Sequence, residues 1–115
     1  MYKVMIVGHG FVGSAVASLF SEKEKVIIDP KFTDNKISDT SGVAFDAVFV
    51  SVDTPKAEGF KLLDSILWEL NYCMVKGTPV CCKSTATPEF YYDVSQKYKN
   101  IKTVSYTHLR AHETS

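Results

Sequence analysis

Three glycines near the N-terminus have the spacing of a phosphate-binding turn. Gly8, Gly10 and Gly13 form a G-x-G-x-x-G pattern between an apolar run and a helical pattern. In such a strand-turn-helix unit the first glycine allows a tight turn, and the second lets a pyrophosphate approach the backbone. The third lets the helix pack closely on the strand. The pattern predicts dinucleotide binding; the simpler alternative is a glycine-rich turn without a ligand.

An acidic residue follows at a suitable distance. Asp29 stands 16 residues after Gly13, at the end of a second apolar run. A carboxylate here can accept a hydrogen bond from the 2′-hydroxyl of an adenosine ribose and would repel a 2′-phosphate, which favours NAD over NADP. The nearby Lys31 leaves NADP as an alternative. Asp29 before Pro30 also favours a turn, and the two roles are compatible.

The spacing of apolar residues predicts the strands and helices that position the glycine turn and Asp29. Apolar runs predict strands at 4–7, 26–28, 45–52, 80–82 and 101–104. Helical spacing predicts three helices with these apolar faces: Val12, Ala15, Val16, Leu19 and Phe20; Leu63, Ile66, Leu67, Leu70, Cys73 and Met74; and Phe90, Val94 and Tyr98. The second helix is expected to end at Gly77 and Pro79, and the third to begin at Thr87 and Pro88. A surface loop or short crossover is expected over residues 31–42. This order predicts an α/β fold with a Rossmann-type, doubly wound parallel sheet.

In such sheets ligands bind at the carboxyl ends of the strands. Besides the glycine turn, two polar stretches are expected there: Asp53-Thr54-Pro55 after the third strand and Lys83-Ser84-Thr85 after the fourth. The three ends therefore form one candidate site.

Composition narrows the class of protein. The chain has 115 residues, enough for one domain, and its 13 basic residues balance 13 acidic ones. This balance predicts neither nucleic acid nor a membrane as partner. Glycines interrupt the short apolar N-terminus, so a signal peptide is not expected and a cytoplasmic location is. Cys73, Cys81 and Cys82 lack C-x-x-C spacing, which predicts buried free thiols rather than a disulfide or metal site.

The motifs taken together resemble the UDP-glucose/GDP-mannose dehydrogenase family, in particular its N-terminal NAD-binding domain. That family carries a glycine turn with aromatic-Val-Gly, a V-x-T-P strand end and a K-S-T strand end, and here the likeness covers residues 1–104. The resemblance implies NAD-dependent oxidation of the C6 alcohol of a nucleotide-sugar to a carboxylate. It implies these cofactor-binding residues: Gly8, Gly10, Phe11, Val12, Gly13, Asp29, Thr54, Pro55, Ser84 and Thr85.

The resemblance also implies that Thr85 lies beside the nicotinamide, where its hydroxyl would help to place a water or the substrate; it is the candidate catalytic residue. The alternatives are a helix-approach cap for Thr85 and a turn before proline for Thr54. The nucleophilic cysteine and the glutamate-bearing segment of the family do not occur in this chain. We therefore expect an inactive NAD-binding portion with a sheet incomplete at its C-terminal side, from a parent that could form a homodimer.

Only 25 residues separate Asp29 from Thr54, so a helix between the second and third strands is expected to be trimmed. Two other functions stay open: a stand-alone nucleotide-binding or regulatory module, and the N-terminal domain of a hydroxyacid or 6-phosphogluconate-type dehydrogenase. Residues 105–115 fit neither the fold nor the family and predict a disordered or artefactual tail. Its His108 and His112 lack a third ligand, so no metal site is predicted.

Overall fold

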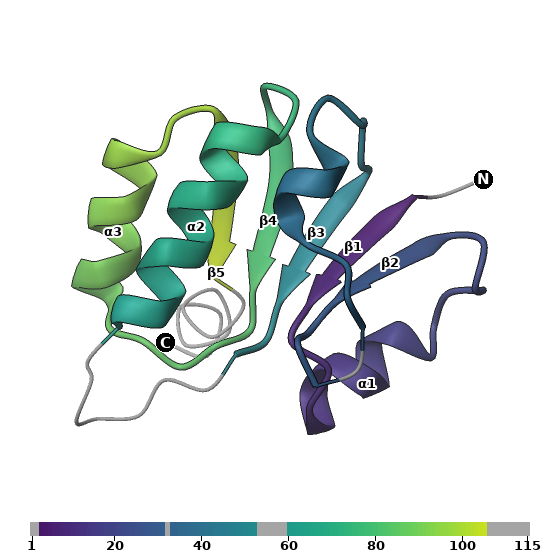
Figure 1. The fold of residues 1–115 in the computed structure, drawn as a ribbon. Helices are drawn as coiled ribbons and strands as arrows, with labels where there is room; N and C mark the ends of the chain where they lie inside the picture. The colour runs from purple at the N-terminus through teal and green to yellow at the C-terminus, as the bar shows by residue number, and fades with distance from the viewer. Residues whose placement is uncertain (1–2, 32, 53–59, 106–115) are drawn as a thin grey trace.

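The computed structural model describes residues 3–31, 33–52 and 60–105. The strands are β1 (Val4–Val7), β2 (Lys25–Ile28), β3 (Ala47–Val50), β4 (Thr78–Cys82) and β5 (Ile101–Ser105); the helices are α1 (Phe11–Ala17), the 3₁₀ helix η1 (Ile37–Thr40), α2 (Lys61–Cys73) and α3 (Pro88–Lys97). All paired strands are parallel, in the order β2-β1-β3-β4-β5 (Figure 1). The predicted parallel α/β sheet is confirmed. The predicted tail began at Ser105, but Ser105 is the last residue of β5. Residues 106–115 lie outside the described residues, so the rest of the tail stays a prediction.

The sheet buries two separate sets of side chains because successive residues of a strand point to opposite faces. Val4 and Ile6 pack with Val16 and Ala17 of α1. On the opposite face, Met5 and the strand residues that point the same way pack in a larger core, which η1, α2 and α3 cover. Helices therefore cover both faces, as a doubly wound sheet requires.

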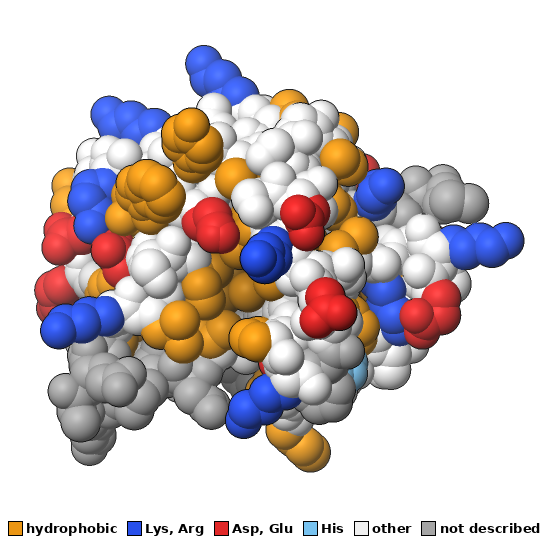
Figure 2. Space-filling view, in the orientation of Figure 1, with side chains coloured by type: hydrophobic (Ala, Val, Ile, Leu, Met, Phe, Trp, Pro, Cys, Tyr) orange, Lys and Arg blue, Asp and Glu red, His pale blue; other side chains and the backbone are white. Residues whose placement is uncertain are grey.

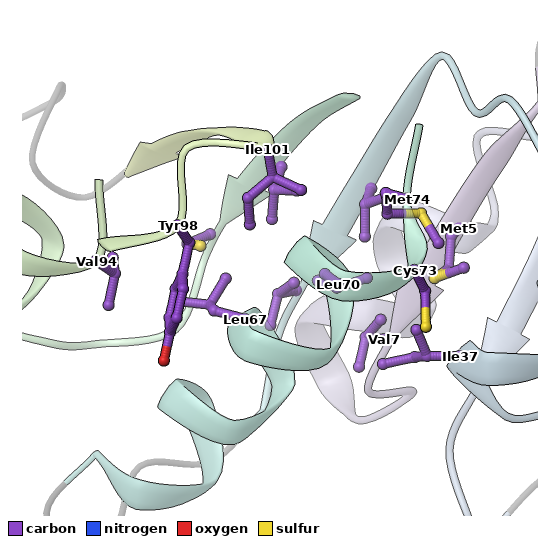
Figure 3. Close-up of a cluster of buried hydrophobic side chains, with 14 of the residues drawn as sticks. Met5, Val7, Ile37, Leu67, Leu70, Cys73, Met74, Val94, Tyr98 and Ile101 are labelled. Carbon is purple, nitrogen blue, oxygen red and sulfur yellow. The ribbon is translucent and has the colours of Figure 1, made fainter. Parts of the chain in front are cut away.

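The larger core contains the apolar stripe predicted for α2. Leu63, Leu67 and Leu70 have no exposed surface, and Cys73 and Met74 are buried beside Met5 and Ile37 (Figure 3). The face of α3 differs by one position, since Tyr91 joins Val94 and Tyr98 in the core while Phe90 is half-buried. The outer face of α2, α3 and η1 carries lysine and acidic side chains interspersed with hydrophobic ones (Figure 2). Among the described residues no helix has the length and apolarity to cross a membrane.

The buried face of α1 agrees with the prediction at Val16 and at the half-buried Phe20, and differs from it elsewhere. Gly13, Val16 and Ala17 are buried, whereas Val12 is 45% exposed and Leu19, beyond the helix end, is 77% exposed. The cause is the close contact of Gly13 with the turn after β1. Once Gly13 faces the sheet, the positions three and four residues later must face it too.

The end of α2 also differs. The helix ends at Cys73, and Gly77, with φ +87°, forms the turn into β4 instead of ending the helix. Asn100 supplies the missing partners: its Nδ2 donates to the carbonyl oxygens of Asn71 (2.9 Å) and Met74 (2.8 Å). A side chain from before β5 thus satisfies the carbonyls at the end of α2.

β2 is half-buried rather than fully buried because it lies at the sheet edge. The carbonyl oxygen of Ile27 accepts hydrogen bonds from Thr33 Oγ1 (2.9 Å) and Asn35 Nδ2 (3.2 Å). The connection after β2 therefore folds back on this edge, then passes through η1 to β3. No helix longer than η1 occurs among the described residues of this connection, which agrees with the predicted short crossover.

Candidate functional site

The strand order reverses between β1 and β3. From β1 the chain continues to β2 on one side, and it then returns to β3 on the other side of β1. The helical connections leave a crevice at this point, where doubly wound sheets bind ligands. A cavity of about 230 Å³ lies here, lined by Gly10, Phe11, Val12, Ser51, Val52, Lys83, Ser84 and Thr85. The structure thus brings the glycine turn and the Lys83-Ser84-Thr85 stretch together.

The three glycines of the turn differ in whether the fold leaves room for a side chain at their positions. Gly8 has φ +94°, and a Cβ there would lie 2.5 Å from the carbonyl oxygen of Ser51. A Cβ on Gly13 would lie 1.9 Å from the carbonyl oxygen of Gly8. Gly10 has an ordinary φ of −80°, and no atom lies within 4 Å of its Cβ position. The fold requires glycine at positions 8 and 13, but nothing in the fold requires it at position 10.

The first turn of α1 faces the cavity. Gly10 is the N-cap residue of α1. Because glycine has no side chain, it makes no capping hydrogen bond and leaves the first N–H groups of the helix to other acceptors. Phe11 is 92% exposed and Val12 is 45% exposed, although both are large and apolar. Backbone donors and apolar surface therefore occur together at this wall of the cavity.

Asp29 lies next to the glycine turn, at the end of β2. Its Oδ2 accepts the backbone N–H of His9 at 2.7 Å, and its Oδ1 accepts that of Lys31 at 2.9 Å. The bond from His9 is the main reason why the pKa of Asp29 lies below its usual value. The predicted turn before Pro30 is present, and each carboxylate oxygen retains acceptor capacity for a further donor.

The Lys83-Ser84-Thr85 stretch is held by the elements around it. Ser84 is buried, and its Oγ accepts the backbone N–H of Val52 at 2.9 Å, joining the ends of β3 and β4. Lys83 donates its backbone N–H to the carbonyl oxygen of Val50 at 2.8 Å. Thr85 is exposed and lines the cavity. Ser84 is therefore the buried residue of this stretch and Thr85 the exposed one.

The described residues that line the cavity include one basic residue. Lys83 is the single charged side chain among its described lining residues, and none of these is a carboxylate. Thr54 and Pro55 lie outside the described residues, so their predicted roles stay predictions. In the described part of the chain no three His, Cys, Asp or Glu side chains converge on a possible metal site.

The cysteines are free thiols, and the predicted burial does not hold for Cys81, which is the most accessible of them. Cys73 and Cys82 are buried, whereas Cys81 is half-buried. Burial raises the pKa of Cys82 to about 12. A thiol with this pKa is protonated at neutral pH and is a poor nucleophile.

Sequence reasoning missed four residues that shape this site: His9, Ser51, Val52 and Tyr91. Ser51 and Val52 end the third apolar run, so their position at a strand's carboxyl end was a usable signal. His9 acts through its backbone, which its residue type does not reveal. Tyr91 stands in α3 and contacts the site through one hydroxyl, for which the sequence has no signal.

Comparison with known proteins supports the fold. A search found no matching protein-family model and no matching curated protein. Among solved structures, the chain is similar to the crystal structure of a "Putative oxidoreductase" from Mycobacterium avium 104, with a TM-score of 0.72 and 18% identity. The fold is Rossmann-like. The match covers 91% of this chain and 41% of that protein, so the chain spans less than half of its length. At this identity the likeness concerns the fold, and the resemblance to nucleotide-sugar dehydrogenases stays a hypothesis.

Proposed function

We propose that this chain is the NAD-binding portion of an oxidoreductase, and that the parent enzyme is a nucleotide-sugar 6-dehydrogenase. The observation that carries the proposal is the open space at Gly10. Gly8 and Gly13 are explained by contacts within the fold, but Gly10 adopts a backbone conformation open to any residue. A ligand that approaches the backbone at this point gives a reason for the missing side chain.

The residues around Gly10 suit the parts of a dinucleotide. The N–H groups at the start of α1 would hold the pyrophosphate, and Lys83 adds a positive charge to the same cavity. Asp29, fixed beside the turn by its bonds to His9 and Lys31, would accept the ribose hydroxyls. When bound, NAD accepts a hydride from the alcohol carbon of a substrate.

Thr85 is the residue we assign to the reacting end. Its hydroxyl, at the exposed end of β4, would hold a water or the substrate hydroxyl beside the nicotinamide. The nucleotide-sugar substrate rests on the combined glycine, V-x-T-P and K-S-T motifs. Since the chain lacks the family's nucleophilic cysteine, we propose that this portion binds the cofactor without turnover. The oxidoreductase description of the similar solved structure is compatible with this function.

Isothermal titration of the whole chain with NAD tests the proposal. We expect binding, and we expect Gly10→Val to weaken it at least tenfold. The added side chain enters open space, so the melting temperature should fall by no more than about 8 °C, the scale of the roughly 1 kcal/mol lost when valine replaces glycine at an N-cap. Ala15→Val, at an exposed position of α1 outside the cavity lining, is the matched control and should bind as the wild type does. A folded chain that shows no binding at millimolar NAD would overturn the proposal, as would unchanged affinity in Gly10→Val.

NADP provides the test of Asp29. The carboxylate should make NADP bind more weakly than NAD, and Asp29→Ala should reduce this preference by weakening NAD. Equal affinity for both cofactors in the wild type would remove the assigned ribose role while leaving the Gly10 result to decide on dinucleotide binding.

A further inference from the structure

Tyr91 reaches the candidate site from the core beneath it. Its ring is 6% exposed and packs in the large hydrophobic cluster between α3 and the sheet. Its hydroxyl donates a hydrogen bond to the backbone carbonyl oxygen of Ser84. Tyr91 does not line the cavity, but this bond joins it to a residue that does.

The carbonyl that accepts this bond belongs to the peptide unit that joins Ser84 to Thr85. Because a peptide unit is planar and rigid, fixing its oxygen also fixes the direction of the Thr85 nitrogen and limits where Thr85 can lie. The preceding residue is held as well, since Ser84 Oγ accepts the N–H of Val52 at 2.9 Å. The turn is thus tied to β3 on one side and to α3 on the other.

We propose that Tyr91 is a positioning residue that sets the orientation of Thr85 in the cavity. This inference rests on the proposed function, because Thr85 is the residue assigned to the nicotinamide end of the site. Loss of the hydroxyl leaves a buried carbonyl without this donor and allows the peptide unit to rotate. The ligand then meets a Thr85 that is no longer held in one orientation.

Tyr91→Phe is the direct test, because it removes the hydroxyl and keeps the ring. Tyr98→Phe is the matched control: Tyr98 lies just past the end of α3, and its hydroxyl donates to Asp64 Oδ1 at 3.0 Å, away from the cavity. Both variants lose one hydroxyl bond from the α3 region. Only Tyr91→Phe alters the peptide unit before Thr85.

Two readouts separate positioning from general destabilisation. By titration, Tyr91→Phe should weaken NAD binding about fivefold to tenfold, the scale of one hydrogen bond. By hydrogen exchange, the Thr85 amide should exchange faster in Tyr91→Phe than in the wild type. Tyr98→Phe should leave both values unchanged, even where it lowers the melting temperature equally.

The outcomes distinguish this inference from the proposed function. NAD affinity within twofold of the wild type in Tyr91→Phe, or an equal loss in Tyr98→Phe, overturns the positioning role. If the wild type itself binds no NAD, the proposed function fails, and the exchange rate of the Thr85 amide still decides whether Tyr91 orders this turn. Should Tyr91→Phe not fold, Tyr91→Met removes the same hydroxyl and fills the core with a flexible apolar side chain; it should give the same fivefold to tenfold loss, and an affinity within twofold of the wild type would overturn the positioning role.

Discussion

The backbone N–H of His9 donates a 2.7 Å hydrogen bond to the carboxylate of Asp29. His9 lies inside the glycine turn after β1, and Asp29 follows β2, so this bond ties together the carboxyl ends of two neighbouring strands. The same carboxylate accepts the N–H of Lys31. The residue predicted to bind a ribose therefore also shapes the turn that would bind the pyrophosphate.

This bond predicts a pH dependence of stability. The N–H of His9 stabilises the ionised carboxylate, so the folded-state pKa of Asp29 is lower than its usual value of 3.8. The contribution to stability is then fully present above the unfolded-state pKa and is lost as the pH falls from 3.8 through the lower folded-state pKa. In urea unfolding at a series of pH values, Asp29→Asn should lose less stability than the wild type over this range. Parallel curves for the two proteins would contradict the prediction.

Alanine should destabilise the fold at one glycine of the turn and leave its stability nearly unchanged at another. In Gly13→Ala the new Cβ would lie 1.9 Å from the Gly8 carbonyl oxygen, so backbone must move. We expect a loss of about 3 kcal/mol in the free energy of unfolding, the upper end for overpacking. Gly10→Ala meets no atom within 4 Å and should change stability by less than about 0.5 kcal/mol. Urea unfolding measures both, and a destabilised Gly10→Ala would show that the fold itself requires glycine there.

Local patterns predicted much of this fold. The apolar run of β1, the strand-turn-helix context of the glycines and the helical stripe of α2 each depend on residues close in the chain, and the structure confirms these three elements. The predicted face of α1 was right at Val16 and wrong at Val12 and Leu19, because the contact between Gly13 and Gly8 sets which side faces the sheet, and an apolar count ignores that contact. The close packing of Gly13 on the backbone of the preceding turn outweighed the hydrophobic pattern of a helix only seven residues long.

The site was predictable only in part, for a similar reason. Strand ends mark the glycine turn and Lys83-Ser84-Thr85, because parallel strands bring their carboxyl ends to one edge. The bonds that order those ends come from elsewhere: Tyr91 reaches Ser84 from α3, and Val52 reaches it from 32 residues away. Neither residue type nor spacing indicates such bonds before the fold is known.

The side chain of Asn100 should stabilise the fold at the end of α2, away from the cavity. Its side chain donates to the carbonyl oxygens of Asn71 and Met74 and replaces the glycine cap expected at the end of α2. Asn100→Ala should therefore cost about 1–3 kcal/mol, because two part-buried carbonyls lose their donor. Asn35→Ala is a suitable control. The side-chain amide of Asn35 donates to the carbonyl oxygen of Ile27, and this oxygen keeps a second donor, the hydroxyl of Thr33, when the amide is removed. Equal losses in the two variants would contradict the capping role of Asn100.

Neighbouring cysteines on β4 should differ in reactivity. Cys82 points into the large core with no exposed surface, whereas Cys81 lies on the opposite face and is half-buried. Burial, and then the adjacent Cys81, raise the pKa of Cys82 from 9.0 to about 12. Burial also raises the pKa of Cys81, and Lys83 partly offsets this effect.

Iodoacetamide should therefore label Cys81 before Cys82 in the native protein, and peptide mass spectrometry would give the order. In 8 M urea the preference should disappear, because both thiols then have similar pKa values and full access. The same shift has a thermodynamic consequence: the contribution of Cys82 to stability is full below pH 9.0 and declines as the pH rises toward 12, since the unfolded thiol ionises first. Cys82→Ala should lack this alkaline decline, and equal native labelling of both cysteines would show that Cys82 is not held in the core.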